Sequence, residues 1–163
     1  MMKKILALVL ALVLMLGCVP AMAQNIEDLY DGVWVQFDGG FEVYMPSDWQ
    51  EIEMDDSDRE QGFFYGACSA DQSVLMMMAW SPLEAEMKLE ELHEIIAASQ
   101  PAEMLTVNGI GLICAADAAN NTVYFMGLDG VDLGYYTFLF APITDEATKG
   151  YAALIASSLR NLQ

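Results

Sequence analysis

The chain has 163 residues, of which 24 are acidic and six basic, and its formal net charge at pH 7 is −18. So acidic a surface repels nucleic-acid phosphates and anionic lipid, which excludes nucleic acid and membrane surfaces as expected partners. It favours cationic partners instead: a basic protein, a basic peptide or an amine-bearing cell-wall polymer. Solubility alone is the simpler explanation of the charge.

Residues 1–23 have the three-part layout of a secretory signal peptide. Lys3 and Lys4 precede the apolar run 5–16, and Ala21-Met22-Ala23 supplies the small residues that signal peptidase needs. We therefore expect cleavage after Ala23 and a secreted, extracytoplasmic protein. The apolar run is shorter than the roughly 20 residues that span a bilayer, so no stable membrane insertion is expected.

Cys18 leaves a second route of export open. Gly17-Cys18 matches the end of a lipoprotein signal, and lipidation of Cys18 would anchor the protein to the membrane. Met15 and Leu16 fit that signal poorly, whereas Ala21-Met22-Ala23 fits simple secretion well. We therefore prefer secretion.

The remaining chain, residues 24–163, has the length of one domain. Without Lys3 and Lys4 it carries four basic residues against 24 acidic ones, a net charge of −20. Alternating apolar and polar residues, separated by turn signals such as Asp38-Gly39-Gly40, predict eight strands. These are 33–37, 41–45, 50–54, 62–68, 73–80, 104–115, 122–128 and 133–140. Residues 74–80 are apolar on both faces, which indicates a central strand.

Two helices are expected. Ser81, Pro82 and Glu84 have the pattern of a helix N-terminus, and this helix should run to about Ala98. Its buried stripe is Ala85, Leu89, Leu92 and Ile96. The second helix should open at Thr144, with an inner face of Ala147, Tyr151, Leu154, Ile155, Ser158 and Leu162.

These elements predict an α+β fold in which helices cover a twisted, mostly antiparallel sheet. Their order, together with the phrase Phe41-Glu42-Val43-Tyr44-Met45-Pro46-Ser47-Asp48-Trp49, resembles the PsbP-like superfamily of small exported proteins. The resemblance implies a PsbP-like α/β/α sandwich and a role in binding or assembly. It brings no catalytic motif, and no cofactor is expected.

Carboxylates are the first candidate ligands. Asp55, Asp56, Asp58 and Glu60 form one cluster, and Asp129 with Asp132 forms a second group. Hard cations such as Ca²⁺ take several carboxylate oxygens. The spacing of an EF-hand is absent, so a solvated acidic loop is the preferred interpretation and no metal is assigned.

Sulfur and histidine are weaker candidates. Met76 and Met78 share a strand face and Cys68 is nearby, a set that could bind Cu(I), but methionine as core filler explains the run without a metal and is preferred. His93 could serve a catalytic cysteine, but it lies among glutamates on the polar side of its helix.

Cys68 and Cys114 are open to two interpretations. Export to an oxidising compartment allows a disulfide between them. Two buried free thiols are the alternative, since cysteine is among the most buried residue types.

Aromatic residues suggest a binding surface. Trp34, Tyr44 and Trp49 lie close together in sequence around the first hairpin and could form a platform for a peptide or a sugar, unless they are the edge of the core.

The sequence therefore favours a secreted, acidic binding or assembly module without catalytic activity. The alternative is a small extracytoplasmic hydrolase that uses paired carboxylates, because two of the many acids could meet in a cleft. Exposed acids around a filled core would favour the module, and two facing acids in an apolar pocket would favour the hydrolase.

Overall fold

The computed structural model describes residues 26–162. The expected signal peptide, Cys18 and the cleavage point after Ala23 lie outside these residues. In the described part, no helix combines the length and the apolar character that crossing a bilayer requires.

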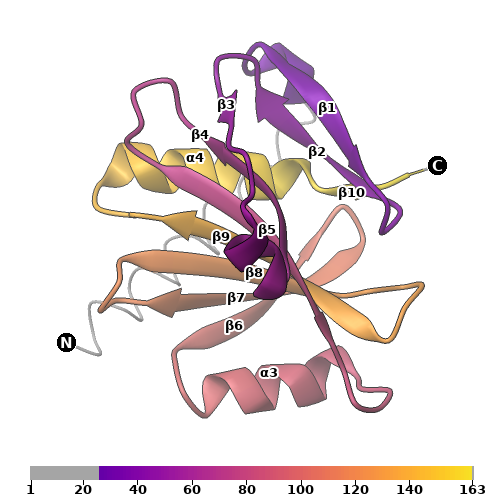
Figure 1. Cartoon of the computed structure of the whole chain (residues 1–163). Helices are drawn as coiled ribbons and strands as arrows, with labels where there is room; N and C mark the ends of the chain where they lie inside the picture. The colour runs from indigo at the N-terminus through magenta and orange to yellow at the C-terminus, as the bar shows by residue number, and fades with distance from the viewer. Residues whose placement is uncertain (1–25, 163) are drawn as a thin grey trace.

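Two antiparallel sheets form the frame of the protein (Figure 1). The large sheet has the strand order β3-β4-β5-β9-β8-β7-β6. Its strands are β3 (Gln50–Glu51), β4 (Phe63–Cys68), β5 (Leu75–Pro82), β6 (Ala102–Val107), β7 (Ile110–Asp117), β8 (Thr122–Leu128) and β9 (Gly134–Ala141). The small sheet has the order β1-β2-β10, with β1 (Gly32–Phe37), β2 (Phe41–Pro46) and β10 (Arg160–Asn161).

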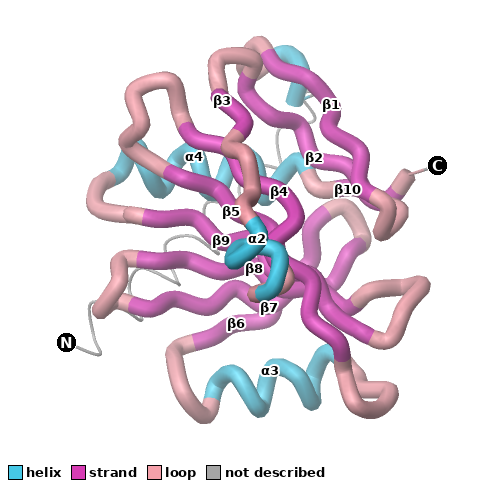
Figure 2. Tube along the Cα trace, in the orientation of Figure 1, coloured by secondary structure: helices cyan, strands magenta, loops and turns pink. Residues whose placement is uncertain are grey.

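The helices lie on both faces of the large sheet (Figure 2). On one face, α4 (Glu146–Ser158) and β2 pack onto β5, β7, β8 and β9. The larger core lies there and is built around Val43, Met76, Phe125, Phe140 and Ile155, each at most 1% exposed. On the other face, α3 (Leu89–Ala97) covers β7 and β8 through a smaller core of Leu92, Ile113, Ala115 and Met126. The expected α+β fold is confirmed.

The central position of β5 is also confirmed. It pairs with β4 on one side and with β9 on the other. Met76 and Met78 are fully buried in the larger core, whereas Met77 faces the other side of the sheet and is half-buried.

The expected strand 104–115 is wrong in one respect, because it is two strands joined by a tight turn. Val107 pairs with Ile110, and the two residues between them have positive φ angles, 49° at Asn108 and 83° at Gly109. Asn-Gly is the preferred pair for such a hairpin. The long apolar run on either side obscured it.

The expected helix start at Ser81 is also wrong. Ser81 and Pro82 continue β5 and pair with Tyr135 and Gly134 of β9. The sheet hydrogen bonds displace the local capping pattern, and α3 begins only at Leu89. Leu89, Leu92 and Ile96 still form its buried stripe, but Ala85 is exposed and precedes the helix.

Two further boundaries differ from expectation. The strand expected over 50–54 is limited to Gln50 and Glu51, and the acidic loop after it contains the short helix α2 (Asp56–Glu60). At the other end of the chain, α4 stops at Ser158, because the chain turns into β10 and pairs with β2. Leu162 is therefore 38% exposed rather than on the inner face of a helix, and Ala147 is exposed as well.

Candidate functional site

The main candidate site is a cleft of about 390 Å³ where the two sheets meet. We call it the aromatic–acidic cleft. It lies at the side of the molecule that carries the β1–β2 turn and the β8–β9 loop (Figure 1). Its lining residues are Gln36, Phe37, Asp38, Gly39, Phe64, Trp80, Asp132 and Tyr136. Ligand pockets are typically about 300–1,000 Å³, so this volume suits a small group or a single side chain.

A β-bulge in β4 brings aromatic rings together. Phe63 pairs with Ala79 and Tyr65 with Met78, so Phe64 is the extra residue of a β-bulge. Bulges redirect side chains, and here the rings of Phe64 and Tyr65 both contact Phe37, at centroid distances of 6.0 and 5.2 Å.

Gly39 is required where the β1–β2 turn approaches β9. A Cβ atom at Gly39 would lie 2.2 Å from the hydroxyl oxygen of Tyr136. With a side chain at position 39, Tyr136 or the turn would have to shift, so Gly39 allows the small sheet to form one wall of the cleft against Tyr136.

Asp129 fixes the two polar aromatic residues from the β8–β9 loop. Its Oδ2 accepts a hydrogen bond of 3.0 Å from the indole Nε1 of Trp80, and the hydroxyl of Tyr136 also donates to its carboxylate. The amide of Val131 donates to Oδ1 at 2.9 Å. Trp80 and Tyr136 are cross-strand partners, so one carboxylate holds two neighbouring rings in place.

The charge around the cleft is negative. Burial of Tyr136, followed by the negative charges of Asp129, Asp132 and Asp38, raises the pKa of its hydroxyl to about 12. Burial raises the pKa of Asp129, but the hydrogen bonds from Val131, Asp132, Trp80 and Tyr136 outweigh it and lower that pKa overall. Asp129 is therefore a fixed negative charge behind the rings, while Asp38 and Asp132 are exposed at the cleft.

This arrangement suits a cation. The donor groups of Trp80 and Tyr136 point to Asp129, and the side-chain amide of Gln36 donates to Glu42. The cleft itself thus presents aromatic rings and the carboxylate oxygens of Asp38 and Asp132, and its described lining includes no basic residue. Rings and carboxylates together attract ammonium or guanidinium groups.

The predicted aromatic platform is only partly assembled. Trp34 and Tyr44 are cross-strand partners with ring centroids 5.1 Å apart, but Trp49 packs on Tyr151 of α4 instead. Tyr44 is buried. The guanidinium carbon of Arg160 lies 3.4 Å from the ring centroid of Trp34, so the protein's own cation covers that ring.

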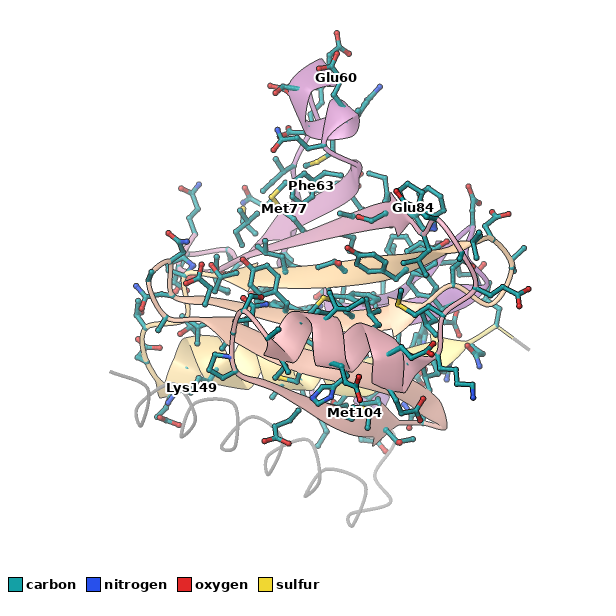
Figure 3. The ribbon with its side chains drawn as sticks, turned by 90° about the horizontal axis from the view of Figure 1, so that it is seen from below. Glu60, Phe63, Met77, Glu84, Met104 and Lys149 are labelled. Atoms are coloured by element: carbon teal, nitrogen blue, oxygen red, sulfur yellow. The ribbon has the colours of Figure 1, made fainter. Side chains whose placement is uncertain are left out.

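The acidic cluster after β3 has a structural role. Asp55 caps α2 by accepting from the amide of Asp58, and the carboxylate of Asp58 accepts from the amide of Asp55. This short helix projects from the body of the protein, with Glu60 at its tip (Figure 3). Among residues 26–162, no three acids, histidines or cysteines gather closely enough to hold a metal ion.

Cys68 and Cys114 are free thiols in the described part of the chain, so the structure has no disulfide between them. Cys68 is on β4 and Cys114 on β7, with β5, β9 and β8 between them. Four strand spacings amount to about 19 Å, whereas a disulfide needs Cα atoms within about 7 Å. Cys114 is fully buried, and burial raises the pKa of its thiol to about 12, so it is a core residue. Cys68 is half-buried.

The sulfur and histidine candidates do not meet. Cys68 pairs with Leu75, on the opposite face of the sheet from Met76 and Met78. His93 is half-buried rather than exposed, and its Nε2 lies 3.2 Å from the carbonyl oxygen of Ala102. It packs with α3 on one face of the sheet, and Cys114 lies in the core on the other.

The comparisons with known proteins bear on the fold alone. No family model matches the chain, and no curated protein matches it. A crystal structure from Bacteroides thetaiotaomicron is similar, with a TM-score of 0.55 and 14% sequence identity. The match covers 82% of this chain and 49% of that chain, so the protein spans about half of its structural relative. The PsbP-like resemblance stays a prediction.

Proposed function

We propose that the protein is an extracytoplasmic binding module, without catalytic activity, that holds a positively charged group of its partner in the aromatic–acidic cleft. The observation that carries the proposal is the composition of the cleft. Four aromatic residues and two exposed carboxylates line it, and the donors of its polar rings are occupied outside it. The secretory pattern of residues 1–23 supports the extracytoplasmic location.

The burial of the acidic residues and the pKa of Asp129 support the same proposal. Among the described residues, Glu42 is the single buried carboxylate, and it has Arg160 as its partner. A general acid in a hydrolase needs a carboxyl group with a raised pKa. The pKa of Asp129 is lowered instead, and Asp38 and Asp132 are exposed. The paired-carboxylate hydrolase therefore gains no support from the cleft.

The proposal predicts selective binding of an ammonium group. N-acetyl-lysinamide should bind, and N-acetyl-norleucinamide, which lacks the ammonium group, should not. An NMR titration that follows the indole N–H signal of Trp80 would report both. The double variant Asp38→Asn/Asp132→Asn should weaken lysinamide binding about tenfold, roughly 1.4 kcal/mol, because both carboxylate contacts are lost.

A matched control separates the cleft from the overall charge. Asp48→Asn/Glu53→Gln removes two charges from exposed positions at the opposite end of β2 and beyond β3. This variant should bind lysinamide as the unaltered protein does. If both double variants weaken binding equally, the attraction is diffuse and the cleft is not a site.

A further inference from the structure

A second hollow adjoins the aromatic–acidic cleft. It is an apolar crevice of about 100 Å³, and it shares Gly39 and Tyr136 with the cleft as common lining. Its walls come from both sheets and from the end of α4, and consist mainly of Phe41, Ile110, Leu112, Leu128, Phe138 and Leu159. Tyr136 thus lines both the charged cleft and the apolar crevice.

The crevice is small and apolar. A cavity of about 150 Å³ lined by aliphatic and aromatic residues can bind benzene, so a crevice of about 100 Å³ fits a branched aliphatic group. Asn161, which is exposed, supplies the polar side chain in its lining. A polar or charged group placed there would lose water among mainly apolar walls, which is unfavourable unless hydrogen bonds replace that water.

The loop beside both hollows exposes further apolar surface. In the β8–β9 loop, Val131 is 78% and Leu133 45% exposed, and Phe64 in the cleft is 41% exposed. Exposed apolar side chains that gather around a concave site are typical of a surface that contacts a macromolecule.

We infer that the ligand is a segment of a basic polypeptide in which a lysine or arginine is next to a branched aliphatic residue. This inference rests on the proposed function and names its partner class. The basic side chain occupies the aromatic–acidic cleft, and the aliphatic side chain occupies the crevice beyond Tyr136. The apolar crevice disfavours the other amine-bearing partner, a polymer of amino sugars, because such a polymer has no aliphatic side chain to place there.

Short peptides test the inference. Acetyl-leucyl-lysinamide and acetyl-glycyl-lysinamide carry the same charge and differ in the aliphatic side chain. The leucyl peptide should bind about tenfold more tightly, as expected from burying one aliphatic side chain. An oligomer of glucosamine serves as the competing amine probe and should bind no better than the glycyl peptide.

Variants at the crevice locate the effect. Asn161→Trp should block the crevice, so that the leucyl and glycyl peptides then bind with equal affinity. Gly130→Val is a second variant in the crevice lining, and it should be tolerated because a Cβ atom at Gly130 meets no atom within 4 Å. Gln50→Trp adds the same bulk to an exposed position of β3, on the far edge of the large sheet, and should keep the preference.

The outcomes separate the two proposals. If the glycyl peptide binds and the leucyl peptide gains nothing, the peptide inference fails and the cation-binding function stands. The same holds if the glucosamine oligomer binds most tightly. If none of the three probes binds, or if Asp38→Asn/Asp132→Asn leaves their binding unchanged, the proposed function fails as well.

Discussion

A carboxylate in the interior of an acidic protein needs a cation nearby, and Glu42 has one. Its Oε1 accepts from the Nε of Arg160 at 2.7 Å, and its Oε2 accepts from the amide of Gln36 at 3.2 Å. Trp34 lies against the guanidinium on the other side. The charged side chain of Arg160 thus joins β10 to β2 and β1, and it fills the aromatic surface that the sequence suggested for a ligand.

Removing this cation should destabilise the fold. We expect Arg160→Gln to lower the free energy of unfolding by about 1–2 kcal/mol, less than for a fully buried pair because Arg160 is partly exposed. Arg160→Lys should cost less, since it keeps the charge. Urea unfolding measures both, and the double variant Glu42→Gln/Arg160→Gln should recover part of the loss. If Arg160→Gln has no effect, Glu42 is not held by this pair.

At the scale of elements, three loops use the same aspartate turn. Asp71, Asp117 and Asp129 each accept, through Oδ1, a hydrogen bond from the amide two residues later, at 3.0, 2.9 and 2.9 Å. Aspartate favours such turns because its side chain replaces a backbone acceptor. Residues 68–71 and 114–117 share the pattern Cys-x-Ala-Asp, and the common aspartate turn explains this similarity.

These turns predict a pH dependence that Asp117 can isolate. Hydrogen bonds from the side chain of Asn120 and the amide of Ala119 lower the pKa of Asp117. A lowered folded-state pKa contributes stability above the unfolded pKa of about 3.9, and this contribution is lost as the pH falls through the folded value. The unaltered protein should therefore exceed Asp117→Asn in stability at pH 7, and the difference should vanish near pH 2.

The unaltered protein and Asp117→Asn share all their other acidic residues. Comparing their stabilities at each pH therefore cancels the effect of protonating those residues. Urea midpoints between pH 2 and pH 7 provide the measurement. Glu53→Gln, at an exposed position, is the control and should show a smaller change with pH. A difference that persists unchanged at pH 2 would mean that the charge of Asp117 contributes nothing to the turn.

Local sequence patterns predicted which helices and strands exist better than they predicted where each one begins and ends. Asp38-Gly39-Gly40 predicted the first hairpin, because its turn geometry depends on neighbouring residues alone. Ser81 and Pro82 predicted a helix start that does not exist, because Tyr135 and Gly134, about 50 residues away, pair with them. The capping pattern could not reveal a partner so distant in sequence.

At the scale of the molecule, the site depends on contacts that no local pattern contains. Asp38, Phe64, Trp80 and Tyr136 come from four strands or turns, and the bulge at Phe64 is a property of strand pairing. Trp34, Tyr44 and Trp49 are close in sequence, yet Trp49 packs on Tyr151 of α4 and not with the other two. Asp129 and Asp132 are close in sequence, but their spacing does not predict that Trp80 donates to Asp129 or that Asp132 lines the cleft.

The excess of negative charge should govern stability as a whole. With 24 acidic residues against six basic ones, exposed carboxylates repel one another in the folded state. Added salt screens them, with a Debye length of about 10 Å at 0.1 M, so NaCl should raise the melting temperature by a few degrees. Differential scanning calorimetry across a NaCl series measures this.

Calcium distinguishes screening from a specific site in this same experiment. Because the acids of α2 cap their own helix, we expect millimolar CaCl₂ to do no more than NaCl of equal ionic strength. A specific site would add RT ln(1 + [L]/Kd), about 2.7 kcal/mol at a hundredfold excess over Kd. Asp56→Asn/Glu60→Gln removes two of these acids without removing the capping residues Asp55 and Asp58. A saturable calcium shift that this variant abolishes would show that α2 binds the ion, and the acidic cluster would then be a second site on the protein.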